Sequence, residues 1–189
     1  SGKTVLALIS SYLNYLSNYQ SAIMVPTEIL AIQHYKFFKK IFKNQDIKIE
    51  LLSGKTKIKD QKNVREKLKN NEIDIIIGTH SLFQEKIKFF NLGLVVIDEQ
   101  HKFGVKQRIN LSQKGSDNTD VILMTATPIP RTLILTNYGD MNISTIKNKP
   151  FSNNNIETLA KPLNKIDEII DFVNKKINEG DQIYWVCPL

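Results

Sequence analysis

A run of four apolar residues that ends in two carboxylates constrains the fold of this chain more than any other feature. Leu94-Val95-Val96-Ile97 runs directly into Asp98 and Glu99. A short continuous apolar run is typical of a strand buried on both faces of a parallel sheet. Open α/β sheets bind ligands at the carboxyl ends of such strands, where Asp98 would hold Mg²⁺ and Glu99 would orient and deprotonate a water. Taken alone, the pattern also fits a solvated strand end with no function.

Further apolar runs predict more strands, and helical patterns separate several of them. Strands are expected at 21–25, 47–52, 73–77, 89–97 and 120–124, and helices at 5–19, 28–42 and 57–70. Strands that alternate with helices form βαβ units with right-handed crossovers, and these build a parallel sheet. The sequence therefore predicts an α/β fold.

Polar residues follow several of these strands and should meet along one edge of the sheet. Thr27 is also a good N-cap for the helix behind it. The residues at these strand ends are Pro26, Thr27, Glu28, Gly78, Thr79, His80, Thr125, Ala126 and Thr127.

The chain opens with Ser1-Gly2-Lys3-Thr4, which matches the end of the phosphate-loop pattern G-x-x-x-x-G-K-[ST]. In such a loop the main-chain N–H groups cradle phosphate oxygens. Lys3 would reach the β- and γ-phosphates, and the Thr4 hydroxyl would bind Mg²⁺. Four residues alone match by chance in many proteins, but the helical pattern that follows is the one a phosphate loop requires.

The net charge, the cysteine and histidine content and the lengths of the apolar runs favour some classes of function and exclude others. The net charge is +7, which permits binding to a nucleic acid and equally fits a lysine-rich solvated surface. One cysteine, Cys187, excludes an internal disulfide and a cysteine-based metal site, and this suits a cytoplasmic protein. The three histidines lack metal-ligand spacing, so no zinc is expected. The sequence has no apolar run of membrane-spanning length.

A change in composition predicts two structural parts. Residues 1–147 should form the first domain, 148–163 a polar linker, and 164–189 the beginning of a second domain. In the last part Asn164 should cap a helix that stops at Gly180, and a strand should follow at 182–187.

Five motifs in order resemble those of superfamily 2 helicases: SGKT (1–4), PTEILA (26–31), GTH (78–80), DEQH (98–101) and TATPIPRT (125–132). Within that superfamily the chain resembles the RecG family of ATP-dependent DNA helicases. The resembling segments are GTHSLFQE (78–85), VVIDEQHKFGVKQR (95–108), MTATPIPRTL (124–133) and YWVCPL (184–189).

The resemblance implies a RecA-like P-loop NTPase sheet with helices on both faces, lacking its first strand, and the start of a second RecA-like domain. It implies a motor that uses ATP and Mg²⁺ to act on forks and Holliday junctions in recombination and repair. The implied partners are branched DNA and the rest of the same helicase, with its wedge domain and second motor domain. A cytoplasmic monomer is expected, and this segment alone should be inactive.

The same resemblance assigns roles to residues. Ser1, Gly2, Lys3, Thr4 and Asp98 would bind ATP with its Mg²⁺, and the catalytic residues would be Lys3, Asp98, Glu99, Gln100 and His101. Gln100 and His101 would sense the γ-phosphate and couple it to DNA. DNA binding or coupling is expected at Pro26, Thr27, Glu28, Gly78, Thr79, His80, Thr125, Ala126, Thr127 and Arg131.

Alternative functions follow from other features. The transcription-repair coupling factor shares TATPIPRT, but Gln100 and the YWVC segment favour RecG. A guanine-nucleotide switch is a second alternative, since Asn164-Lys165-Ile166-Asp167 matches the guanine-binding pattern NKxD. Pro162 and the amphipathic helix favour a helix cap at this position instead. A non-catalytic remnant of a split gene is a third alternative, with the DEQH and TATPIPRT motifs indicating that any decay is recent.

Overall fold

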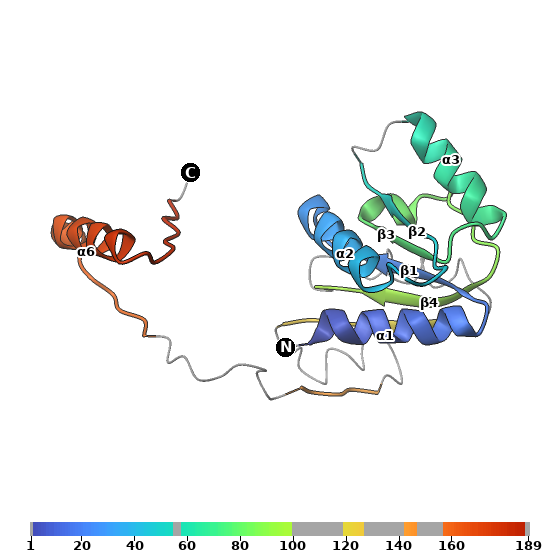
Figure 1. Ribbon diagram of the computed structural model, residues 1–189, viewed down its shortest axis with the longest axis horizontal. Helices are drawn as coiled ribbons and strands as arrows, with labels where there is room; N and C mark the ends of the chain where they lie inside the picture. Colours follow the sequence, from blue (N-terminus) through green and yellow to red (C-terminus); the bar gives the residue numbers. More distant parts are fainter. Residues whose placement is uncertain (1, 55–57, 100–118, 127–141, 147–156, 188–189) are drawn as a thin grey trace. The chain divides into compact units, whose positions relative to one another are not determined.

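The computed structural model describes residues 2–54, 58–99, 119–126, 142–146 and 157–187 (Figure 1). Contacts between Cα atoms divide the chain into two compact units, residues 1–148 and 149–189, and each is described by itself. Several residues with predicted roles lie outside the described part: Ser1, Gln100, His101, Thr127 and Arg131.

The first unit is built on a parallel sheet of five strands in the order β2-β3-β1-β4-β5, which confirms the predicted α/β fold. The strands are β1 (Gln20–Met24), β2 (Ile49–Leu52), β3 (Ile75–Gly78), β4 (Leu92–Ile97) and β5 (Asp120–Leu123). Every residue of β1, β3 and β4 is buried, as expected for strands covered on both faces. The run that ends in Asp98 and Glu99 is β4, and it pairs with β1 and β5.

Helices cover both faces of this sheet (Figure 1). On one face, α1 (Lys3–Leu16) and α2 (Glu28–Ile41) pack Ala7, Leu8, Ala31 and Phe38 against alternate strand residues. On the other face lie α3 (Ile58–Lys69) and the short 3-10 helix η1 (His80–Phe83). The predicted helices are therefore confirmed, with ends that shift by at most three residues.

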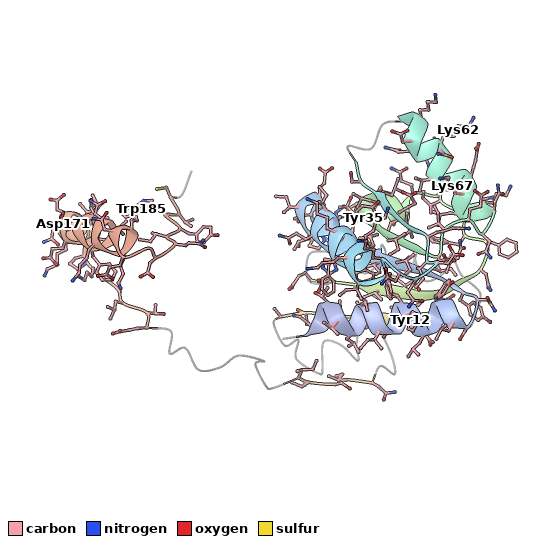
Figure 2. All side chains as sticks on the ribbon, viewed as in Figure 1. Tyr12, Tyr35, Lys62, Lys67, Asp171 and Trp185 are labelled. Atoms are coloured by element: carbon pink, nitrogen blue, oxygen red, sulfur yellow. The ribbon has the colours of Figure 1, made fainter. Side chains whose placement is uncertain are left out.

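Aromatic contacts tie the two helices of the first face together. The Tyr12 ring of α1 stacks on Phe42, which follows α2, at 5.7 Å between centroids. Figure 2 shows Tyr12 and Tyr35 on this side of the unit and Lys62 projecting away from the sheet on α3. The polar residues of α3 thus form a solvated face, while Val64 and Leu68 join the core.

A buried glutamine fastens the amino-terminal edge of the sheet. Gln20, the first residue of β1, is 1% exposed. Its Nε2 donates to the carbonyl oxygens of Leu68 (3.0 Å) and Ile73 (2.8 Å). Its Oε1 accepts from the main-chain N–H groups of Phe90 (2.8 Å) and Asn91 (3.1 Å). One side chain therefore satisfies four main-chain groups from three segments of the chain.

A glycine is required where β3 ends. A Cβ on Gly78 would press on the carbonyl oxygen of Leu52 and lie 3.0 Å from Cγ of Leu82. The same carbonyl already accepts from the Ser81 hydroxyl at 2.9 Å, so it has little freedom to move. The predicted DNA-face residue Gly78 thus has a packing role in this structure.

We expect Gly78→Ala to lower the free energy of unfolding of the chain by about 1–3 kcal/mol, because overpacking against main chain forces the backbone to shift. Urea unfolding followed by circular dichroism measures this. Gly54→Ala is the matched control, since a Cβ there meets nothing within 4 Å, and it should change stability by less than about 0.5 kcal/mol. Equal effects of the two substitutions would contradict the packing role of Gly78.

The second unit consists of a 3-10 turn, η3 (Leu163–Lys165), and the helix α6 (Ile166–Asn178). Gly180 follows with φ of 90°, as predicted for a helix stop. The predicted cap was wrong. Lys165 is the N-cap, without a side-chain bond, because the N–H of Lys165 closes the 3-10 turn onto the Pro162 carbonyl and leaves Asn164 inside that turn.

The predicted strand at 182–187 was also wrong, because these residues form no ladder. A strand needs a neighbour for its N–H and C=O groups, and none pairs with these residues in the described part of the chain. Tyr184 is 89% exposed and Val186 is 88% exposed, so nothing covers the apolar side chains either. In the described ranges, no helix is both long enough and apolar enough to cross a membrane.

Candidate functional site

The candidate site lies where α1 begins. Gly2 is the N-cap of α1 and has φ of 77°, a left-handed conformation that glycine adopts without steric cost. Its carbonyl accepts from the N–H groups of Val5 (3.0 Å) and Leu6 (3.1 Å) and starts the helix. Lys3 and Thr4 therefore occupy the first turn, where main-chain N–H groups favour an anion.

A cleft of about 360 Å³ joins this turn to the end of β4. It collects residues that are far apart in the sequence, from α1, from α2 and from the two positions after β4. Its lining consists of Gly2, Lys3, Thr4, Leu30, Gln33, His34, Phe37, Asp98 and Glu99. The structure thus brings Gly2, Lys3 and Thr4 of the predicted phosphate loop to one cavity with the acidic pair.

Opposite charges face each other across the cleft. The Lys3 ammonium lies 4.0 Å from Oε1 of Glu99, and the two side chains are 22% and 25% exposed. Glu99 has φ of 51°, a left-handed backbone that costs a residue with a Cβ roughly 1–2 kcal/mol. Backbone outliers of this kind gather at functional sites, where the surrounding structure enforces them.

The Asp98 carboxylate is held from two sides. Its residue is 8% exposed, and its main-chain N–H continues the β1–β4 ladder onto Met24 at 2.9 Å. Oδ1 accepts from the N–H of Glu99 at 3.0 Å. Oδ2 lies 3.4 Å from Nε2 of His34, a buried residue of α2. Asp98 is therefore a fixed carboxylate at the wall of the cleft.

Sequence reasoning missed His34. His80 and His101 were assigned roles through their motifs, whereas His34 was considered only for metal-ligand spacing, which it lacks. The sequence nevertheless contained a signal for a buried histidine, since His34 lies between Ala31 and Phe38 in the apolar stripe of this helix. A polar residue in such a stripe needs a partner, and here the partner is the acid at the end of β4.

Several other predicted residues lie outside the cleft lining. Thr27 caps α2, with its Oγ1 accepting from the N–H of Leu30 at 3.3 Å, as predicted. Glu28 accepts from the Ser53 hydroxyl at 2.8 Å, which links the residues after β1 and β2. Gly78 is the last residue of β3, Pro26 follows β1, Thr79 and His80 follow β3, and Thr125 and Ala126 follow β5.

The oxygen donors of the cleft suit Mg²⁺ bound together with a phosphate. Thr4 offers a hydroxyl and Asp98 a carboxylate in the same cavity. Magnesium is commonly held by one or two such groups, with substrate phosphates and water completing its shell. In the described residues, no three His, Cys, Asp or Glu side chains cluster as a closed metal cage would require.

Comparison with known proteins places the chain among helicases. A family model described as DEAD/DEAH box helicase matches residues 1–135. RecG of Bacillus subtilis is 47% identical over 189 residues, which are all of this chain and 28% of that protein. RecG of Thermotoga maritima is 43% identical over the same 189 residues, 24% of its length.

Solved structures of helicases are also similar to this chain. One described as RecG bound to a three-way DNA junction has a TM-score of 0.79 and 41% identity, covering 100% of this chain and 25% of that chain. The Mss116p DEAD-box helicase domain 2 has a TM-score of 0.54 at 18% identity, covering 64% of this chain and 47% of that chain, which shows the fold alone. The chain spans about a quarter of the length of its RecG relatives. Because the family model matches well over half of its residues, the chain belongs to the DEAD/DEAH box helicase family.

Proposed function

We propose that the chain forms the nucleotide-binding part of an ATP-dependent helicase motor that acts on branched DNA. Membership in a helicase family implies the use of a nucleotide. The observation that carries the proposal is the single cleft where Lys3 and Thr4 meet Asp98 and Glu99. Relatives named RecG, one of them solved on a three-way DNA junction, support branched DNA rather than the substrate of a transcription-repair coupling translocase.

In this proposal each side chain of the cleft has one task. Thr4 and Asp98 would hold Mg²⁺, and the ion would neutralise charge on the phosphates. Lys3 exchanges its contact with Glu99 for the β- and γ-phosphates. Glu99, released from Lys3, orients the attacking water and accepts its proton. The Lys3–Glu99 pair at 4.0 Å supports this exchange, since both side chains are still about a quarter exposed, solvent weakens the ion pair, and a polyphosphate competes with it.

The other predicted residues form the DNA and coupling part of the proposal. Pro26, Thr27, Glu28, Gly78, Thr79 and His80 would lie along the DNA, where contacts to sugar and phosphate suffice for a motor that must not read sequence. Thr125, Ala126 and Thr127 would link hydrolysis to movement, and Gln100 and His101 would sense the γ-phosphate. Arg131 would lie near the DNA, and the net charge of +7 suits such a partner.

The proposal also covers the domains to which the chain would belong, its partner domains and its location in the cell. Residues 1–147 would belong to the first motor domain, 148–163 to the linker and 164–189 to the second motor domain. A wedge domain and the remainder of the second motor domain would be partners in the same helicase. The assembled protein would work as a cytoplasmic monomer.

The proposal is tested in a full-length helicase. RecG of Bacillus subtilis, with its matching segment replaced by this chain, is called the chimera below. We expect forked DNA to stimulate ATP hydrolysis by the chimera more than linear duplex does, and Lys3→Ala to abolish that stimulation. Unmodified RecG is the control for the assay. A folded chimera that hydrolyses ATP no faster than its Lys3→Ala variant would contradict the proposal.

A further inference from the structure

We propose that His34 is a positioning residue for Asp98, which sets the carboxylate in the orientation that binds the divalent cation of the nucleotide. The inference rests on the proposed nucleotide site and adds a residue from a helix that carries neither the phosphate-loop residues nor the acidic pair. Its basis is the juxtaposition of a buried imidazole on α2 with the buried carboxylate after β4.

The placement of His34 is fixed by its helix. It is 6% exposed and shares the buried face of α2 with Ala31 and Phe38, both fully buried. Its ring lies 6.5 Å from the Phe38 ring, centroid to centroid. The core packs on both sides of the imidazole along the helix, and its Nε2 lies 3.4 Å from Oδ2 of Asp98 at the wall of the cleft.

Asp98 needs such a partner. The N–H of Glu99 binds Oδ1 at 3.0 Å, which leaves Oδ2 to be fixed by another donor. With Nε2 protonated, His34 supplies that donor and stops rotation of the carboxylate about its last bond. Carboxylates that bind metals are themselves hydrogen-bonded as a rule, and loss of the outer partner commonly weakens metal binding about 10- to 100-fold.

The second ring nitrogen shows that packing alone does not account for a histidine here. Nδ1 is buried and has no hydrogen-bond partner in the described part of the chain. Leaving a polar atom unsatisfied is unfavourable, and an aliphatic residue would fill the same space without that penalty. The histidine is therefore explained by what Nε2 does, which is to face Asp98.

The test measures metal binding directly, apart from catalysis. Binding of Mn²⁺ to the chimera in the presence of ADP is followed by electron paramagnetic resonance. We expect His34→Leu to weaken Mn²⁺ binding by about 10- to 100-fold. His34→Gln should retain most of the affinity, since its amide N–H reaches the region that Nε2 occupies. The melting temperature of each metal-free variant checks folding only, because His34→Leu removes the unsatisfied Nδ1 but also leaves Oδ2 of Asp98 without its donor, two effects of opposite sign.

Phe42→Leu is the matched control, since Phe42 is a buried aromatic residue on the same face of the sheet, two helical turns from His34 and outside the cleft lining. It should lower the melting temperature and leave Mn²⁺ affinity as it was. The inference is overturned if His34→Leu and Phe42→Leu affect Mn²⁺ binding equally, or if His34→Gln binds Mn²⁺ no better than His34→Leu. A chimera with the parental His34 that takes up no Mn²⁺ with ADP would instead overturn the proposed nucleotide site, and this inference with it.

Discussion

In the chimera, Glu99→Gln is expected to slow ATP hydrolysis on forked DNA by roughly 10²–10⁴-fold while the protein still binds ATP, since a positioned general base contributes that much. Glutamine has the same shape and meets the same left-handed backbone at φ of 51°, so the cleft should keep its form. It cannot accept the proton of the attacking water. Phosphate release at saturating DNA gives the turnover, and a fluorescent ATP analogue gives the affinity.

A second expectation concerns the affinity of Glu99→Gln for ATP. Lys3 lies 4.0 Å from Glu99, so removing the negative charge frees the ammonium for phosphate. ATP binding by Glu99→Gln should therefore equal or exceed that of the parent. Glu66→Gln is the control, because Glu66 is exposed on α3, away from the cleft lining. Turnover within tenfold of the parent, or an equal loss of binding and turnover, would count against Glu99 as the base.

The strands of the fold could be predicted because burial on both faces leaves a plain signal in the sequence. The runs that became β1, β3 and β4 are mostly apolar, although β1 starts with Gln20 and Ser21, and each was located to within a few residues. The start of β4 was placed three residues too early. The N–H groups of Phe90 and Asn91 donate to the Gln20 side chain, so these residues do not continue the β4 ladder. A contact between residues seventy positions apart has no local signature.

The position of the cleft follows from the topology of the sheet, but the individual side-chain contacts inside it do not. Once the sheet is parallel, residues after β4 and residues at the start of α1 meet at its carboxyl edge. The contact between His34 and Asp98 depends on the rotation of α2 over the sheet, which periodicity fixes only approximately. The catalytic and DNA-binding roles of the individual residues remain predictions until the variants above are measured.

Local patterns were least reliable where tertiary contacts were absent. Residues 182–187 have the composition of a strand, yet strand propensity mainly measures how well side chains fit a half-buried pleated surface. In the second unit Trp185 is 53% exposed and Tyr184 is 89% exposed, so no such surface forms there. By contrast α6 forms, since a helix satisfies its main-chain groups within itself.

Gln20→Leu is expected to cause the largest loss of stability, about 3–6 kcal/mol of the roughly 5–15 kcal/mol typical of a domain. Leucine has a similar volume, so the effect isolates hydrogen bonding from packing. It leaves the carbonyls of Leu68 and Ile73 buried without the donor at 3.0 Å and 2.8 Å, each costing about 1–3 kcal/mol. The N–H groups of Phe90 and Asn91 lose their acceptor too, but they are only partly buried and reach water more easily.

Urea unfolding of the purified chain measures the total loss, and amide hydrogen exchange locates it. The Phe90 and Asn91 amides should exchange faster in Gln20→Leu, because local opening near β4 no longer breaks a bond to Gln20. Gln45→Leu is the control at an exposed glutamine and should change stability by less than about 0.5 kcal/mol. If Gln20→Leu lost less than about 1 kcal/mol with those amides still protected, the four main-chain groups would have found other partners, and the amino-terminal edge of the sheet would not depend on this side chain.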